Sequence, residues 1–395
     1  MDIGSLIAAA LLALGLIGGD AVLNSGTVKF DIQVTDDLSK RGFTAQLIDA
    51  MMDNYLKQLV EFKSIVRQPT IRSTQTKSLV GAVADALNMG NVTASFQDDL
   101  GLNPVSLSGS LMSSGKGTDD LRFILSGNSR YTGVFTIDEL SNGRPLPVFL
   151  RDMSVRVVAR LEPYAAALDQ FHVFSRRLVE HTSQAGREDV NVFIARMLAS
   201  EAGRRDSDAG DVDHAAFHNL LGLVAMMSQD PAPAEDAFKM ATTLDPALGI
   251  PMINLGLLYV SEHRFDDAIT MADASMKLRQ VTSTPYLVSN AYTVKALALW
   301  GKGDVQGASN NFLAAVKVYP ASLWGYFYWA ELLDSAGNAK DANLIRSRAQ
   351  NNLDVFETYP EVGFLHLRVL TGAGFGVQPI ELDRVRHISE IYDQK

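Results

Sequence analysis

HNLLGLVAMMSQDPAPAEDAFKMATTLDP, residues 218–246, alternates small and large apolar residues at the spacing of two short helices. Gly222 and Ala225 precede a polar loop, and Ala234 follows it. Pro246 closes the stretch, because proline cannot continue a helical hydrogen-bond ladder. Small residues let two helices cross closely. The stretch therefore predicts a helical hairpin.

The same pattern recurs along the second half of the chain. Successive copies lie 34 residues apart, except that six further residues precede the third copy. The corresponding small residues are Gly222, Gly256, Ala296 and Ala330 in the first helices and Ala234, Ala268, Ala308 and Ala342 in the second helices. These residues resemble the tetratricopeptide repeat family, whose unit is a helix–turn–helix of about 34 residues. The resemblance covers residues 213–356 and implies stacked hairpins with a concave, protein-binding groove.

The resemblance also implies which residues line that groove. By repeat register they are Asn219, Leu223, Asn254, Asn290, Trp324 and Phe327. Some family members clamp the C-terminal carboxylate of a partner with Lys, Asn and Arg, and only Asn254 matches that clamp here. The other clamp positions hold Asn219, Leu223, Asn290 and Val294 and supply no positive charge, so recognition of a chaperone tail is not expected.

Aromatic residues cluster in LWGYFYWAE, residues 323–331. The register places Trp324 and Phe327 on the groove side and Trp329 inward. Exposed aromatic rings make effective interface anchors, because they bury much area at low entropic cost. The alternative for these rings is ordinary packing between repeats.

Four residues depart from the repeat pattern and predict irregular third and fourth copies. Lys295 and Arg346 replace large apolar residues, and Gln280 and Asp354 replace the closing proline. VGFLHLRVLTGAGFG, residues 362–376, is expected to form a capping helix before the polar tail.

Residues 26–160 read as a small mixed α/β domain that resembles, in outline, compact modules of bacterial envelope assemblies. Period-2 or β-branched stretches predict strands at residues 29–34, 121–127, 131–140 and 147–161. Asn142-Gly143 is a strong hairpin signal. Helices are expected over residues 45–59, with Thr44 as N-cap and Leu47, Met51, Tyr55 and Leu59 on one face, and over residues 76–90.

The first residues carry a membrane signal. Residues 3–19 are uncharged, and Asp20 follows them. As a helix these 17 residues would span roughly 25 Å, a little less than the ~30 Å hydrocarbon core of a bilayer. A basic n-region and a small-x-small cleavage site are absent. An uncleaved anchor is the preferred reading, with an atypical signal peptide or a buried apolar helix as alternatives. We expect an inner-membrane anchor with the bulk of the chain on the periplasmic side.

Composition excludes several function classes. The 395 residues carry a net charge of -10 and no cysteine. Nucleic-acid binding is not expected, because it needs Lys and Arg against phosphates. The absence of Cys removes disulfides, thiolate metal sites and cysteine nucleophiles.

Candidate sites for chemistry are weak. His214 and His218 share a helical face, but no third ligand stands at a recognised spacing, so surface histidines are favoured. SLMSSGKGTDD, residues 110–120, and GAGFG, residues 372–376, lack the spacing or strand context of phosphate and dinucleotide loops. No catalytic constellation is evident, so we expect no cofactor, no metal and no enzymatic activity.

Together these observations predict an α+β chain. Its expected parts are an anchor helix (residues 1–25), the small α/β domain (26–160), a helical connector (161–212), tetratricopeptide-like repeats (213–356) and a capping helix with tail (357–395). The expected function is that of a membrane-anchored scaffold that binds partner proteins in a larger complex. The alternatives are a ligand-sensing or enzymatic α/β domain that the repeats support, and an accessory factor of an envelope secretion or export complex.

Overall fold

The computed structural model describes residues 27–60, 64–66, 71, 105–114, 120–129, 133–180, 211–228, 230–350, 359 and 361–363. Its contacts divide the chain into two compact units. The first comprises Met1–Phe62 and Gln68–Asp169, and the second comprises Lys63–Arg67 and Gln170–Lys395. The first holds a small sheet with helices and the second is helical, so the fold class is confirmed at this level. The finer domain bounds stay predictions.

The predicted anchor, residues 3–19, and the predicted helix over residues 76–90 lie outside the described residues. Within the part of the chain that is described, none of the helices combines the length and the apolar character that a bilayer crossing requires.

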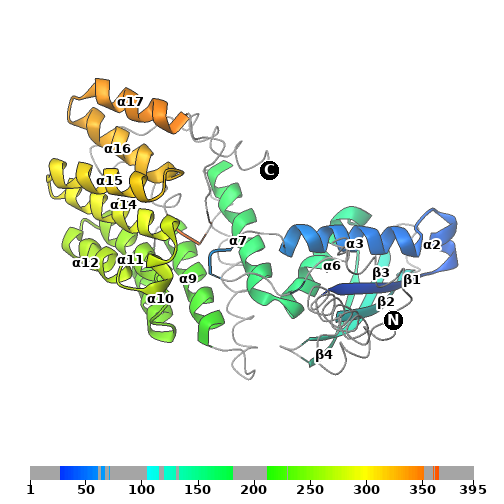
Figure 1. Ribbon diagram of the computed structural model, residues 1–395. Helices are drawn as coiled ribbons and strands as arrows, with labels where there is room; N and C mark the ends of the chain where they lie inside the picture. Colours follow the sequence, from blue (N-terminus) through cyan, green and yellow to red (C-terminus); the bar gives the residue numbers. More distant parts are fainter. Residues whose placement is uncertain are drawn as a thin grey trace, which may run out of the picture. The chain divides into compact units, whose positions relative to one another are not determined.

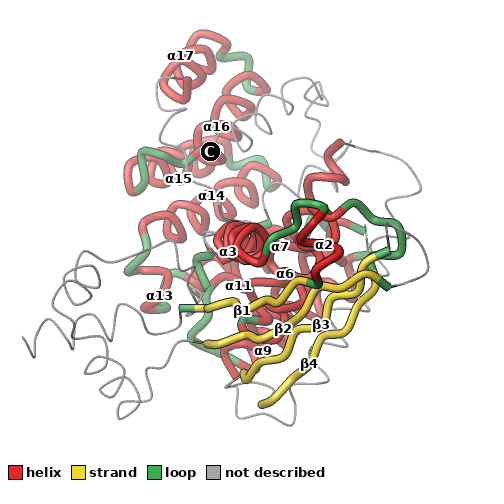
Figure 2. The backbone as a smooth tube through the Cα atoms, turned by 90° about the vertical axis from the view of Figure 1, so that its right-hand side faces the viewer, coloured by secondary structure: helices red, strands yellow, loops and turns green. Residues whose placement is uncertain are grey.

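The first unit is built on a four-stranded sheet of order β1-β2-β3-β4. The strands are β1 (Val28–Val34), β2 (Val105–Ser113), β3 (Leu121–Ser129) and β4 (Gly133–Leu140). β1 pairs parallel with β2, with Val28 opposite Val105, and the other pairs are antiparallel. Figure 2 shows the strands side by side in this order. A parallel pair needs a crossover, and α3 (Ala45–Val60) lies within it.

Helices α3 and α6 (Leu146–Leu161) pack against each other, α3 against β1 and α6 against β4, and a short helix, α2 (Asp36–Lys40), follows β1. Alternate strand residues point into the core, as the period of 2 predicts. The largest fully buried side chains of this core are Ile32, Leu38, Ile48, Met52, Leu56, Phe123 and Phe149.

The helix over residues 45–59 and its cap are confirmed, since the Leu47 amide donates to Thr44 Oγ1 at 3.3 Å. The predicted face is only partly buried, since Leu59 lies in the core and Met51 and Tyr55 pack against it. Leu47 is 43% exposed, whereas Ile48, Met52 and Leu56 are fully buried. The sheet therefore meets the stripe that begins one residue later.

The strand predicted at residues 147–161 is wrong, because this stretch forms α6. Phe149, Met153 and Val157 are fully buried at a spacing of four residues, and this helical period outweighs the β-branched composition. The hairpin predicted at Asn142-Gly143 is wrong for the same reason. The pair forms the turn from β4 into α6, with φ of 50° and 76°.

Among the described residues of the second unit, helices pack in consecutive pairs, which Figure 1 colours from green to orange. The pairs are α9 (Asp211–Met227) with α10 (Pro231–Leu244), α11 (Ile250–Ser261) with α12 (Phe265–Ser275), α14 (Pro285–Gly301) with α15 (Val305–Val318), and α16 (Leu323–Ser335) with α17 (Ala339–Gln350). The extra residues before the third copy contain α13 (Arg279–Thr282). Ahead of the pairs, α7 (Pro163–Glu180) spans the change from the first unit to the second.

The repeat register is confirmed by the packing. First helices contact each other in series, α9 with α11, α11 with α14 and α14 with α16. A Cβ added to Gly222 would lie 2.4 Å from Phe238 Cε1, and one added to Gly256 would lie 2.8 Å from Val294 Cγ1. The small residues are therefore required where helices cross. The chain has the architecture of a tetratricopeptide-type array over these residues.

The third and fourth copies form full hairpins despite their departures from the pattern. Lys295 does not enter the core, because its Nζ pairs with Asp273 Oδ1 at 2.7 Å. Arg346 pairs with Asp334 and Glu331 on the preceding helix. Lys295 thus pairs with a carboxylate of the preceding repeat, and Arg346 pairs with carboxylates within its own helix pair.

Candidate functional site

Three buried asparagines lie on the first helices of successive repeats, at different positions of the repeat register. Asn219 of α9, Asn254 of α11 and Asn290 of α14 are 0%, 0% and 2% exposed. We call them the asparagine row. Buried amides are expensive unless they form hydrogen bonds, so the partners of this row define what it can hold.

A short segment of the chain's own C-terminal part lies against the first two members of the row. Both Asn219 Nδ2 and Asn254 Nδ2 donate to the Glu361 carbonyl oxygen, at 3.1 and 2.8 Å. The Gly363 amide donates to Asn254 Oδ1 at 2.8 Å. Asn254 also donates to Asn219 Oδ1 at 2.8 Å, which fixes both amides. We call Tyr359 and residues 361–363 the docked segment.

The docked segment is also held by shape. Val362 is 4% exposed. A Cβ added to Gly363 would lie 2.8 Å from Leu223 Cδ2 and 3.8 Å from Leu257 Cδ1. A larger residue at this position would have to displace the end of the Leu223 side chain, so glycine is favoured between α9 and α11. The segment is therefore recognised through its main chain and through the absence of one side chain.

An aromatic contact ties the segment to the third repeat. The Tyr359 ring meets the Tyr286 ring edge-on, with centroids 4.8 Å apart, and the Tyr359 amide donates to the Tyr286 hydroxyl at 3.3 Å. Tyr286 also meets Tyr319 edge-on at 5.7 Å. The docked segment thus contacts the first helices of three repeats, α9, α11 and α14.

The Glu361 side chain is fully buried and is held by a second stretch of chain. The Ile65 amide donates to Glu361 Oε1 at 3.2 Å, and residues 63–67 belong to the repeat unit. Burial raises the pKa of Glu361 to about 7, although hydrogen bonds from Ser64 and from the Ile65 and Val66 amides favour the charged form. Among the described residues, Glu361 Oε2 has no hydrogen-bond partner.

The predicted groove residues are thus in different states. Asn219, Leu223 and Asn254 contact the docked segment. Asn290 is buried, and its Nδ2 has no hydrogen-bond partner among the described residues. Their role in binding a partner stays a prediction.

Trp324 and Phe327 are the aromatic residues that were predicted to line the groove. Trp324 is 4% exposed, which favours the alternative of ordinary packing between repeats. It stacks on Tyr328 with centroids 6.2 Å apart and meets the half-buried Phe327 edge-on at 6.1 Å. Trp329 packs beside the buried Tyr326, Ala330 and Ile345, and its Nε1 donates to Ser309 Oγ at 3.0 Å, as its inward register requires.

Sequence reasoning missed the docked segment. It assigned residues 362–376 to a capping helix, but residues 361–363 form a turn, and residues 364–376 lie outside the described residues. One signal was available. Pro360 and Gly363 stand three residues apart, and such spacing favours irregular chain over helix.

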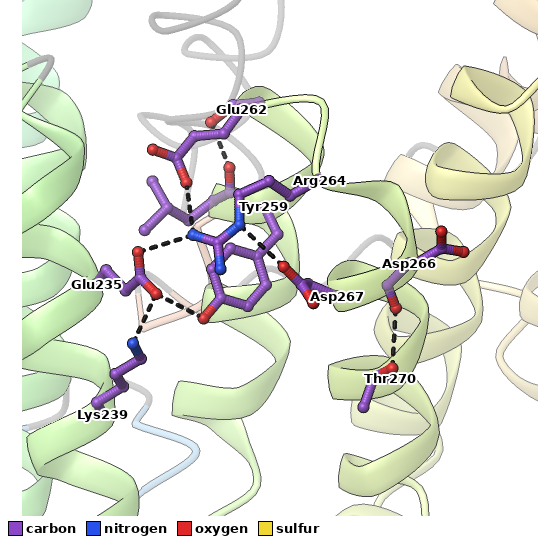
Figure 3. Close-up of polar contacts among 10 residues, drawn as sticks. Glu235, Lys239, Tyr259, Glu262, Arg264, Asp266, Asp267 and Thr270 are labelled. Atoms are coloured by element: carbon purple, nitrogen blue, oxygen red, sulfur yellow. Dashed lines mark hydrogen bonds and ion pairs between the residues drawn. The ribbon is translucent and has the colours of Figure 1, made fainter.

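A second polar cluster joins the first repeat to the second (Figure 3). Glu235 of α10 accepts hydrogen bonds from Tyr259 Oη at 2.8 Å, from Arg264 Nη1 at 2.9 Å and from Lys239 Nζ at 2.7 Å. The Arg264 guanidinium lies over the Tyr259 ring, 3.9 Å from its centroid, and its Nε donates to Asp267 at 2.9 Å.

The pKa values in this cluster indicate a structural role, which is to join the first repeat to the second. Burial raises the pKa of Glu235, but hydrogen bonds from Lys239, Tyr259 and Arg264 outweigh it and leave the pKa at about 2. Burial and the bond to Glu235 raise the pKa of Tyr259 to about 12. Neither group titrates near neutral pH. The cluster therefore fixes α10 against α11 and α12, and it does not supply a proton donor or acceptor.

The remaining candidates carry little chemistry in the described part of the chain. No group of three or more His, Cys, Asp or Glu residues there is arranged to hold a metal ion. His214 Nε2 is buried and has no hydrogen-bond partner among described residues. Residues 110–113 belong to β2 and residues 121–129 to β3. The element after the GKG stretch is therefore a strand, as predicted, and not the helix that a phosphate-binding loop requires. Residues 115–119, and the GAGFG stretch, lie outside the described residues.

No family model and no curated protein matches the chain. Solved structures with partial similarity include MamA residues 41 to the end from Desulfovibrio magneticus RS-1, with 13% identity over 47% of this chain and 94% of that chain and a TM-score of 0.33. A crystal structure of MamA has 16% identity over 43% and 91%, with a TM-score of 0.32. Pseudomonas aeruginosa pilF has 15% identity over 58% and 97%, with a TM-score of 0.34. The repeat architecture is defined by the helix pairs described above.

Proposed function

We propose that this chain, a tetratricopeptide-type repeat protein, is a non-enzymatic scaffold that binds short segments of partner proteins along the asparagine row. The observation that carries the proposal is the pair of bonds from Asn219 and Asn254 to the Glu361 carbonyl, with the return bond from Gly363. Every polypeptide has such main-chain groups. A row of buried amides that binds them can therefore hold a segment whatever most of its side chains are.

The row suits a polypeptide ligand because its chemistry is neutral and directional. Its three members are amides, each with donors and an acceptor. Buried main-chain groups must be paired, and a helix face cannot pair them with its own backbone. Amide side chains supply the missing partners, so a short non-helical segment can be buried between repeats with its main-chain groups paired.

The proposal includes a membrane anchor. Residues 3–19 are uncharged and nearly long enough to span a bilayer as a helix. Anchoring would confine the repeat array to the membrane surface, where it would hold the components of an inner-membrane complex on the periplasmic side. The scaffold role and the anchor are separable, because they depend on different residues.

Co-purification tests the scaffold role. The full chain, the double variant Asn219→Ala/Asn254→Ala and the control Asn310→Ala would be expressed at equal levels and cross-linked in cells. Asn310 lies exposed on α15 and bonds only to Gln306 among described residues. Partners retained by the wild type and the control, and lost by the double variant, are expected. Equal retention by all three chains would exclude binding along the row.

Membrane fractionation tests the anchor. The full chain is expected in the membrane fraction, resistant to high salt and to carbonate, and a chain without residues 1–25 is expected in the supernatant. Sedimentation of both forms with the membranes would assign attachment to another part of the chain.

A further inference from the structure

The asparagine row is already occupied by the chain itself. The docked segment uses two of the three asparagines, the space beside Leu223 and the Tyr286 ring. A partner segment that used the same bonds would meet the same atoms. Both segments cannot be bound at once, so the state of the docked segment decides whether the row is open.

The docked segment leaves two buried polar atoms without hydrogen bonds. Among the described residues, Asn290 Nδ2 is a buried donor without an acceptor, and Glu361 Oε2 is a buried acceptor without a donor. Each such atom loses its bonds to water and gains nothing in return. The docked segment therefore binds less tightly than a segment that carries no buried carboxyl group at the place of Glu361.

We propose that the docked segment is an internal ligand that closes the asparagine row until a partner replaces it. The replacing partner is a polypeptide segment that adopts the same turn, with an aromatic residue four positions before a glycine and an uncharged residue at the place of Glu361. The inference rests on the proposed function, since it concerns what regulates the same site.

Each required feature follows from one contact. The aromatic residue takes the place of Tyr359 against Tyr286, whose hydroxyl accepts from the main chain. The glycine takes the place of Gly363, because any Cβ there would meet Leu223. The residue two positions before that glycine lies at the place of Glu361, where an uncharged side chain avoids the cost of burying a carboxylate.

Tethering gives the internal ligand a large advantage over a free copy of itself. A segment on the same chain has an effective concentration on the order of millimolar. A free ligand binds only those molecules whose row is open. Its apparent dissociation constant therefore equals the intrinsic constant divided by the open fraction. Weakening the docked segment should therefore raise the affinity for an added peptide, although no residue of the row has changed.

The test is the binding of a fluorescein-labelled peptide with the sequence of residues 357–365, ETYPEVGFL, to the full chain, followed by anisotropy. Gly363→Val adds atoms where a Cβ already lies 2.8 Å from Leu223 Cδ2, so it expels the tethered segment. We expect the Gly363→Val chain to bind the peptide at least about tenfold more tightly than the wild type does. A peptide that carries the same Gly363→Val change should bind to neither chain.

A second variant covers misfolding of the first. Tyr359→Ala removes the ring contact with Tyr286 without adding volume, and it should give a smaller gain in the same direction. Adding Asn254→Ala to the Gly363→Val chain should abolish peptide binding, whereas adding Asn310→Ala should not change it. Circular dichroism on each chain confirms that the helices are retained.

Two results would overturn the inference. Equal affinity for the wild type, Gly363→Val and Tyr359→Ala would mean that the docked segment does not block the row. No binding by any folded chain would mean that the segment is not a ligand of the row. In both cases an asparagine-dependent co-purification would leave the proposed function standing. Conversely, peptide release without asparagine-dependent partners would count against the scaffold role alone.

Discussion

Asn254 binds the docked segment on both sides of Val362, donating to the Glu361 carbonyl and accepting from the Gly363 amide, each at 2.8 Å. One side-chain amide thus satisfies two main-chain groups that are 107 and 109 residues away in sequence. This arrangement makes Asn254 the residue on which docking depends most.

Replacing Asn254 by alanine should destabilise the repeat unit by about 1–3 kcal/mol, because buried groups of Glu361 and Gly363 would lose a partner. Denaturant unfolding of the full chain measures the loss. Asn310→Ala, at an exposed site, should stay within about 0.5 kcal/mol of the wild type. A loss no larger for Asn254→Ala than for this control would show that the docked segment is not bound in solution.

Docking should weaken as the pH rises. The pKa of Glu361 is raised to about 7 by burial, above its ordinary value near 4.5. The docked state therefore holds its proton longer than the undocked state. Its stability is full below about pH 4.5 and is lost as the pH rises toward about 7.

The measurement is the unfolding free energy of the wild type minus that of Glu361→Gln, from about pH 5.5 to about pH 8. Glutamine does not titrate, so shared pH effects cancel in the difference. The wild type should lose stability relative to the variant up to about pH 7, with little change above it. A flat difference would mean that Glu361 is solvated rather than buried.

Removing Arg264 should loosen the joint between the first two repeats. Arg264→Ala takes a cation from Glu235, whose carboxylate is 18% exposed, and a stacking partner from Tyr259. We expect a loss of roughly 1–3 kcal/mol in thermal or denaturant unfolding. Lys302→Ala breaks an exposed ion pair with Asp266 and is the control, with an expected loss below about 1 kcal/mol. If Arg264→Ala and Lys302→Ala lost the same stability, Arg264 would contribute no more than an exposed ion pair does.

A single methyl group at the first helix crossing should also be costly. Gly222→Ala places a Cβ 2.4 Å from Phe238 Cε1, and Phe238 is fully buried. Overpacking of this kind costs about 1–3 kcal/mol. Phe238→Leu makes room, so the double variant should lose less than the two single losses added together. Strict additivity in urea unfolding would contradict the tight crossing.

Local periodicity predicted most of the repeat half and part of the α/β unit. Gly222 and Gly256 marked helix crossings that the coordinates confirm. The error at residues 147–161 arose from composition, because the valines favoured a strand. The four-residue spacing of Phe149, Met153 and Val157, which are buried in α6, indicates a helix. Period is the stronger signal because it reports which face is buried, whereas β propensity depends on context.

The strand β2 escaped prediction for a related reason. Its residues Ser106, Ser108 and Ser110 face away from the core, and only Leu107 and Leu111 are fully buried. Four of its nine residues are apolar, but Gly109 interrupts the alternation and Met112 falls on the opposite face, so the pattern is weak. The strand exists because β1 and β3 flank it and pair with its main chain.

By itself, the sequence determined the stack of helix pairs, since small residues at a fixed interval allow close crossings wherever they recur. It also placed one asparagine on the first helix of each of three successive repeats. Only the tertiary structure decided what fills the first two, because the bonds that hold Glu361 and Gly363 are mostly made by main-chain groups. Every residue carries those groups, so no side-chain pattern marks the segment that docks. Its choice follows from the space beside Leu223 and the ring of Tyr286, which exist only once the repeats have packed.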